Sequence, residues 1–261
     1  MRNFTLGIYK KLLQVLVAGG CSFQSLEGFI RQPAGKAVIF RHDVDRLPGN
    51  ALVIAEIEKK VGIKASYYFR IVKQSYNEDI IRQIAGMGHE IGYHYEDLSL
   101  CKGDDEAAIR HFEVNLEKFR KIYPVKTICM HGSPLSRWDN RDLWKKYDYR
   151  DFGIIAEPYF DIDFNDVFYL TDTGRRWDGS DVSVRDKVAG KGQNAFDNLK
   201  FQSTMDIIEA AKNGLLPDRV MINTHPQRWD DRFVPWAKEL VWQNAKNIVK
   251  KLIVSCKGAK A

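Results

Sequence analysis

Short apolar runs alternate with amphipathic stretches along most of the chain. Runs rich in β-branched and aromatic residues predict strands at Ala37–Phe40, Ala65–Phe69, Glu90–Tyr93, Thr127–Met130, Val167–Thr171 and Val220–Asn223. Helical spacing lies between them, at Ala51–Val61, Asn77–Gly86, Asp104–Tyr123, Ser203–Asn213 and Val234–Ile253. This rhythm, with polar residues at the strand ends, favours a parallel α/β architecture that closes as a barrel.

The N-terminal segment has the pattern of an amphipathic helix that ends at Gly19-Gly20. Its apolar positions are Ile8, Leu12, Leu13 and Leu16. Gln14 interrupts the apolar run, which is too short for a signal peptide or a transmembrane segment. With no internal repeat or linker in sight, we expect one (β/α)-barrel domain over residues 1–261, with residues 1–35 as a helical lead-in.

Composition and charge narrow the function classes. The chain is 44% hydrophobic and 28% charged, as in ordinary globular proteins, and its net charge of +6 comes from 40 basic and 34 acidic residues. The basic residues are spread out, which gives little support for nucleic-acid binding but is compatible with an anionic substrate. Four widely spaced cysteines form no CxxC pair, so we expect reduced thiols in a cytoplasmic enzyme.

A polar cluster, Arg41-His42-Asp43-Val44-Asp45, directly follows the first expected strand. Asp43 and Asp45 are two residues apart and would point to the same face of an extended strand. Two such carboxylates repel each other unless a cation or a shared proton intervenes. The pattern indicates a metal site, an acid/base pair or both, whereas a lone aspartate at this place would simply cap the next helix.

Five of the six histidines lie within or beside expected strand ends: His42, His89, His94, His131 and His225. If these strands share a sheet, their carboxyl ends converge on one cleft. Imidazole and carboxylate groups are suitable ligands for zinc and similar ions, and a further histidine could act as a general acid.

Three motifs together resemble the polysaccharide deacetylase (NodB-homology) family. They are Asp43-Val44-Asp45, the segment Gly88–His94 and the late His225-Pro-x-x-Trp229, and Lys64–Phe69 resembles the second-strand segment of that family. The resemblance spans roughly Val38 to Trp229. It implies a distorted (β/α) barrel and a divalent metal, often zinc, that serves to hydrolyse N- or O-acyl groups on sugars.

By this resemblance, Asp43 is the general base and Asp45 a metal ligand, although many members have the two aspartates adjacent. His94 matches the first of two histidine ligands, and His225 matches the histidine that protonates the leaving group. Leu98 occupies the place of the second histidine ligand. Because leucine cannot bind a metal, another group must complete the metal shell.

The remaining expected site residues are a third metal ligand and a supporting pair. We prefer His131 as the ligand, because it follows the next expected strand, although it could also be a hydrogen-bonded loop residue. The alternatives are Glu96, Asp97, His42 or water. Asp172 and Arg176 resemble the family's motif that orients the base.

The function that this resemblance implies is metal-dependent deacetylation or deformylation of an N-acyl sugar. Without an export signal, the expected substrate is a nucleotide- or lipid-linked intermediate of surface polysaccharide (O-antigen-like) synthesis. The alternatives are a metal-free carbohydrate-binding relative without catalysis and a hydrolase of non-sugar C–N bonds. Trp177 and Trp229 could line a sugar site or belong to the core.

Overall fold

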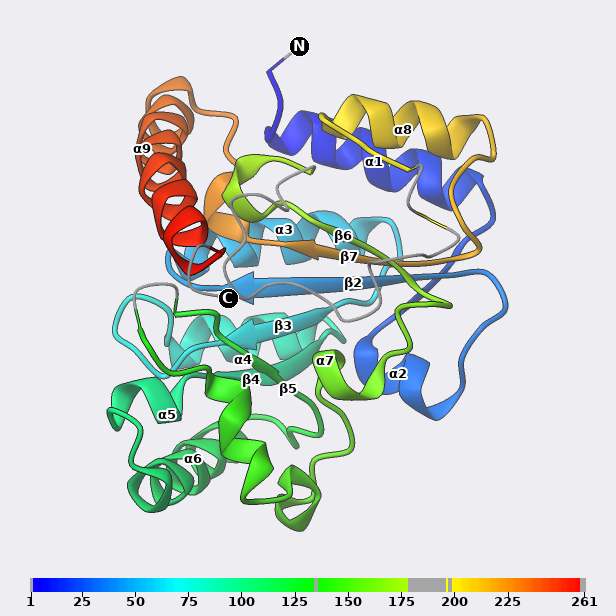
Figure 1. The fold of residues 1–261 in the computed structure, drawn as a ribbon. Coiled ribbons are helices and arrows are strands. Elements are labelled where there is room, and N and C mark those ends of the chain that lie inside the picture. The colour runs from blue at the N-terminus through cyan, green and yellow to red at the C-terminus, as the bar shows by residue number, and fades with distance from the viewer. Residues whose placement is uncertain (1, 134–135, 178–195, 197–198, 259–261) are drawn as a thin grey trace.

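Seven strands and a set of covering helices make up the computed structural model, which describes residues 2–133, 136–177, 196 and 199–258 (Figure 1). The strands are β1 (Ser22–Gln24), β2 (Ala37–Val44), β3 (Ser66–Phe69), β4 (Glu90–Tyr95), β5 (Ile128–Met130), β6 (Phe168–Thr171) and β7 (Arg219–Thr224). The α-helices are α1 (Leu6–Ala18), α2 (Leu26–Arg31), α3 (Pro48–Lys60), α4 (Glu78–Gly86), α5 (Asp97–Leu100), α6 (Asp105–Arg120), α7 (Pro158–Asp161), α8 (Thr204–Lys212) and α9 (Phe233–Gly258). Short 3-10 helices are η1 (Asn140–Lys145), η2 (Tyr149–Phe152), η3 (Thr173–Arg175) and η5 (Pro226–Arg228).

All the strand pairs are parallel, in the order β5-β4-β3-β2-β7-β6, with β1 beside the first half of β2. Within the described residues no ladder joins β5 to β6, so the sheet forms a curled half-barrel. The predicted distorted (β/α) barrel is confirmed in this form. Because the strands are parallel, their carboxyl ends share one edge, and α9 lies at that edge in Figure 1.

The central strand β2 is longer than the sequence pattern predicted. It continues past Phe40 through His42 and Asp43 to Val44, and all eight of its residues are buried. The extension follows from pairing on both sides: Arg41–Val44 pair with β3, and β7 pairs along the other edge. The strand therefore delivers polar side chains into the interior rather than to a surface loop.

The N-terminal segment is more than the expected helical lead-in. β1 pairs with the start of β2, so residues 1–35 contribute a strand to the sheet. The predicted helix is present as α1, and it lies beside α8 (Figure 1). The Tyr9 hydroxyl donates a hydrogen bond to the buried carboxylate of Glu58 on α3, which ties the segment to the centre of the fold.

Two tryptophans that could have lined a sugar site belong to the core. Trp177 stacks on Phe4 with ring centroids 6.1 Å apart, and Trp229 is 1% exposed. Residues 178–195, 197 and 198 of the expected loop-rich stretch lie outside the described residues. Among the helices that are described, none has the length and apolar character required to span a bilayer.

Candidate metal and catalytic site

The polar strand ends meet at the carboxyl edge of the sheet. Asp43 lies on β2 with Asp45 just beyond it, and His94 lies on β4. His131 follows β5, and His225 follows β7. Ligand atoms of Asp45, His94 and His131 all lie within 4.8 Å of one another. The structure therefore brings the three predicted ligand residues together.

The geometry of these three residues fits a divalent cation. The Asp45 Oδ1 atom lies 3.6 Å from His94 Nε2 and 3.4 Å from His131 Nε2. This oxygen is buried and has no hydrogen-bond partner. A buried polar atom without a partner is costly unless another group satisfies it. Two imidazoles and one carboxylate are a common protein ligand set of catalytic zinc, with the fourth position left open.

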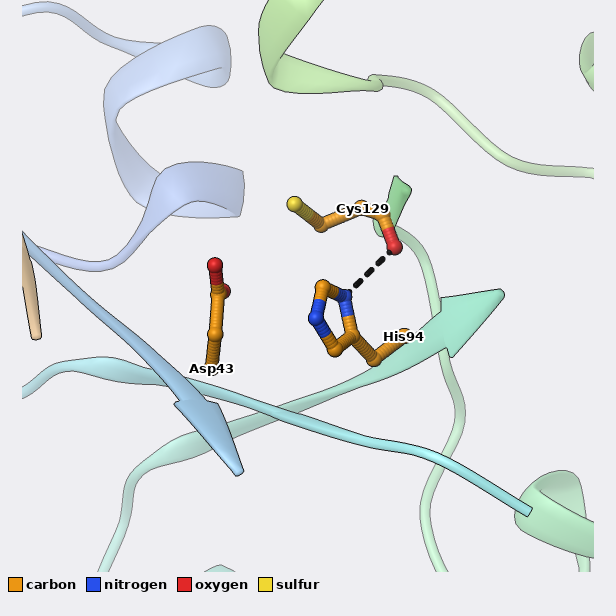
Figure 2. A group of neighbouring side chains, drawn as sticks. All are labelled: Asp43, His94 and Cys129. Carbon is orange, nitrogen blue, oxygen red and sulfur yellow. Dashed lines mark hydrogen bonds between the residues drawn. The ribbon is translucent and has the colours of Figure 1, made fainter. Parts of the chain in front are cut away.

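Both histidines are oriented by hydrogen bonds at their outer nitrogens. His94 Nδ1 donates to the carbonyl oxygen of Cys129 at 2.9 Å, as Figure 2 shows. His131 Nδ1 lies 2.9 Å from Glu96 Oε2, and Arg70 holds the same carboxylate through an Nε–Oε1 contact of 2.7 Å. Each Nε2 is thereby left as an acceptor, the arrangement typical of metal-binding histidines.

The histidines and Arg70 keep the carboxylates of this cluster ionised. Burial alone would raise the pKa of Glu96, but His131 and Arg70 outweigh it and lower that pKa to about 2. Burial likewise opposes ionisation of Asp45, yet His94, His131 and His225 hold its pKa well below the usual value. The two carboxylates are therefore negatively charged at neutral pH, as a cation site requires.

A second group of possible ligands shares His94 and consists of Asp43, His94 and Cys129 (Figure 2). A cation in this group would lie beside Arg41, whose Nη2 is 3.0 Å from Asp43 Oδ2. The like charges would repel each other in a buried environment. The group that contains Asp45 is therefore the better cation site.

Asp43 is positioned to act as a base. Its Oδ2 atom accepts hydrogen bonds from Arg41 Nη2 at 3.0 Å and from Asn223 Nδ2 at 2.9 Å. The other oxygen, Oδ1, is buried without a hydrogen-bond partner. The carboxylate is thus held in place through one oxygen while the other can accept a proton.

Asp172 contacts the expected acid, not the expected base. His225 Nδ1 lies 2.6 Å from Asp172 Oδ1, and the Trp229 indole donates to Oδ2 at 2.8 Å. For Asp172 the structure thus shows contacts with His225 and Trp229 where contact with Asp43 was expected, while the supporting role of Arg176 stays a prediction. Asp172 directly follows β6, which pairs with β7, so Asp172 lies beside His225 and is one strand removed from Asp43 on β2.

The Nε2 atom of His225 faces the cluster, 4.0 Å from Asp45 Oδ2. On the other side of the ring, Asp172 is buried and charged. Burial would raise its pKa, but Arg228 and His225 lower it. Arg176, the other residue of the expected supporting pair, follows η3 in extended backbone with a half-buried side chain.

The alternative third ligands have other partners. His42 is buried between Glu58 at 2.8 Å and Thr224 at 2.6 Å. Asp97 accepts hydrogen bonds from the Tyr93 hydroxyl and His111. Glu96 lies behind His131, as described above. Leu98 is 3% exposed and packs in the hydrophobic core, so its position takes no part in the site.

Two amide side chains of the site were missed in the sequence. Asn223 holds Asp43, and Gln227 donates to Asp45 Oδ2 at 3.1 Å. Both flank His225, Asn223 at the end of β7 and Gln227 within the His-Pro-x-x-Trp motif. Their nearness to a motif histidine was the available signal, but an amide side chain alone does not indicate its role.

No protein-family model and no curated protein sequence matches the chain. Several solved structures do match it. The chain is similar to structures of the CE4 family. One is BA3943, a CE4 family pseudoenzyme from Bacillus anthracis, at 14% identity, with a TM-score of 0.43 and 84% of this chain covered. A BA3943 mutant with restored enzymatic activity matches at 14% identity and a TM-score of 0.44, over 84% of this chain.

The third similar structure is the Xyl-CE4 domain of a multidomain xylanase from the hindgut metagenome of Trinervitermes trinervoides. It matches at 12% identity and a TM-score of 0.40, over 82% of each chain. The present chain spans 63% of the BA3943 chain and 65% of its mutant. CE4 is the polysaccharide deacetylase family, the one that the motifs resemble. Since identities are low and every TM-score is below 0.5, the function rests on this chain's own residues.

Proposed function

We propose that the protein is a divergent polysaccharide deacetylase, a metal-dependent hydrolase that removes an N-acyl group from a sugar. The observation that carries this proposal is the convergence of Asp45, His94 and His131 next to a base and an acid. Asp43 shares a group of neighbouring side chains with His94, and His225 Nε2 lies 4.0 Å from Asp45 Oδ2. Hydrolysis of an amide needs both kinds of group, because water must lose a proton and the departing amine must gain one.

Zn²⁺ is the cation that this donor set suits best, since it combines two imidazoles with one carboxylate. Asp45, His94 and His131 would hold it. The chemistry that such an ion supplies is polarisation of the acyl carbonyl and activation of water. Glu96 and the Cys129 carbonyl keep the two imidazoles in the orientation that binding requires.

The protein's own groups carry the proton transfers. Asp43 takes a proton from the attacking water at its unpartnered Oδ1, while Arg41 and Asn223 hold Oδ2. His225 donates a proton to the sugar amine from Nε2. Asp172 fixes the imidazole through Nδ1 and stabilises its charged form.

The substrate belongs to the same proposal. We place the reaction in the cytoplasm, on a nucleotide- or lipid-linked intermediate of surface polysaccharide synthesis. The net charge of +6 suits a substrate that carries phosphate.

The first test is the metal content of protein purified without chelator. We expect close to one zinc per chain in the wild type, and its loss in Asp45→Asn and His94→Ala. His111→Ala is the matched control, because His111 also pairs with a carboxylate but lies outside the cluster. Thermal melting should show that all variants fold. A wild type that binds no zinc or cobalt after soaking would contradict the metal-dependent mechanism and favour the metal-free binding protein.

Cobalt substitution separates the two ligand groups. With His131 as ligand, the spectrum of the cobalt protein should lack a thiolate charge-transfer band and should not change in Cys129→Ser. A charge-transfer band that disappears in Cys129→Ser would instead assign the group of Asp43, His94 and Cys129. Release of acetate or formate from N-acyl sugars, compared with non-sugar amides, then tests the substrate class.

A further inference from the structure

A pocket of about 430 Å³ opens directly beside the candidate site, between the start of α3, η5 and the first half of α9. One wall of the pocket is shared with the candidate site. Gln227 lines the pocket and donates to Asp45, and Arg228 lines it while pairing with Asp172. A molecule in the pocket would therefore lie within reach of the groups assigned to catalysis.

The pocket is lined by more positive than negative charge. Its cations are Arg46, Arg228, Arg232 and Lys238, and its carboxylates are Asp230 and Glu239. Four positive and two negative side chains leave a net charge of +2. Two surface cations are already paired, Arg46 with Glu239 and Arg232 with Asp230. Arg228 pairs with Asp172, so among the described residues Lys238 is the lining cation without an ion-pair partner.

Buried polar atoms in the pocket wall lack partners. Arg228 is 5% exposed, and its Nε atom has no hydrogen-bond partner. Gln227 is 6% exposed, and its Oε1 atom likewise has none. An unpartnered guanidinium N–H in a positive pocket is a donor for an anion.

On α9, which forms the outer wall of the pocket, several polar side chains are buried while large apolar side chains are exposed. α9 turns Glu239, Gln243 and Asn247 inward, where they are buried. Trp242 and Leu47, in contrast, line the pocket and are 57% and 50% exposed. The pocket therefore offers apolar and aromatic side chains next to its cations, which suits a ligand with a charged group and an apolar or flat group attached to it.

We propose that this pocket binds the phosphate or diphosphate group through which the acyl sugar is attached to its carrier. The proposal rests on the proposed function, because it places the sugar at the site and the phosphate beside it. A phosphate ester would be recognised by Arg228 Nε and by the charges of Arg46, Arg232 and Lys238. Guanidinium and ammonium groups are the usual phosphate binders.

The test uses inorganic pyrophosphate as the probe, measured by titration calorimetry on the full chain. Lys238→Glu should weaken binding about tenfold, equivalent to about 1.4 kcal/mol. The matched control is Lys10→Glu, which makes the same charge change on the exposed face of α1 and should leave binding unchanged. Arg232→Gln is the second pocket variant and should also weaken binding. Equal affinities in the wild type and both pocket variants, or no binding at all, would overturn the proposal.

A further arm separates the pocket from the metal site. Asp45→Asn should lose metal but keep pyrophosphate binding, so the pocket can be confirmed even if the proposed hydrolase function fails. Loss of pyrophosphate binding in Asp45→Asn would instead mean that the anion binds the metal, which overturns the pocket assignment.

The carrier is distinguished by competition against pyrophosphate. Displacement by UDP supports a nucleotide-linked substrate, and displacement by decyl phosphate supports a lipid-linked one. If decyl phosphate is preferred, Leu47→Ser, a change in the apolar part of the pocket lining, should weaken binding of decyl phosphate and leave that of UDP unchanged. Failure of both compounds to compete would overturn the inference that the pocket serves a phosphate-linked carrier.

Discussion

Glu96 offers the sharpest test of how the candidate metal site is built. Its carboxylate is 4% exposed and receives donors on both oxygens, His131 Nδ1 at 2.9 Å on Oε2 and Arg70 Nε at 2.7 Å on Oε1. In Glu96→Gln the shape is kept, but one oxygen becomes an NH₂ group. Because both neighbours are donors, the amide can satisfy only one of them. Either His131 loses its orienting partner or Arg70 loses its own.

The expected magnitude follows from that loss. Removing the outer partner of a metal-binding histidine typically costs 10- to 100-fold in metal affinity, or about 1.4–2.7 kcal/mol. The variant also leaves a buried hydrogen-bond donor without an acceptor, and this lowers the free energy of unfolding by about 1–3 kcal/mol. Zinc affinity is measured by competition with a chelating indicator, and the stability of the metal-free protein by urea unfolding.

The matched control is Glu78→Gln, which removes the charge from an ordinary exposed ion pair with Arg82. It should change neither zinc affinity nor, by more than about 0.5 kcal/mol, stability. If Glu96→Gln binds zinc as tightly as the wild type, His131 is not held for metal binding and the ligand assignment is wrong. Equal losses in both variants would point to a general effect of charge instead.

Three further predictions concern the acid, a buried carboxyl group and a close contact. Asp172→Asn should lower kcat by about 10²–10⁴-fold through His225 while zinc content stays unchanged, as measured by turnover and elemental analysis. Burial raises the pKa of Glu157 from 4.5 to about 7, so the stability it contributes is complete below pH 4.5 and is lost as pH rises to 7. Glu157→Gln should remove this loss of about 3 kcal/mol, seen by comparing urea unfolding of the two proteins across that range. In Gly92→Ala, the new Cβ would overlap the ring of Tyr68, so urea unfolding should show a destabilisation of about 1–3 kcal/mol.

The fold could be predicted from the sequence because its elements carry strong periodic patterns. Asn77 and Ser203 accept hydrogen bonds from backbone N–H groups at the helix starts where the pattern placed them. β1 was missed because its three residues, Ser22–Gln24, are at most partly buried and too few to show a period. A strand of this kind is defined by its pairing with β2, which a local pattern does not contain.

The candidate site was predictable as a set of residues but not as a set of contacts. Polar strand ends in a parallel sheet must share one edge, so Asp43, Asp45, His94, His131 and His225 could be expected together. Which of them touch depends on strand order. β7 lies between β2 and β6 although it follows both in the sequence. Asp172, which follows β6, therefore contacts His225, whereas Asp43 contacts Arg41. No local pattern encodes that order.

The leucine at the place of the second motif histidine does not by itself argue against a metal. Leu98 lies on α5 in the core, whereas His131 reaches the cluster from the neighbouring strand. β5 pairs with β4 so that His94 is opposite Cys129, and the His131 backbone N–H continues the ladder to the Tyr95 carbonyl at 2.8 Å. The segment that lacks the motif histidine still provides Glu96, whose carboxylate contacts His131, the proposed ligand that follows the adjacent strand. A site with a replaced ligand and no remaining metal would have no reason to keep that charged, buried support.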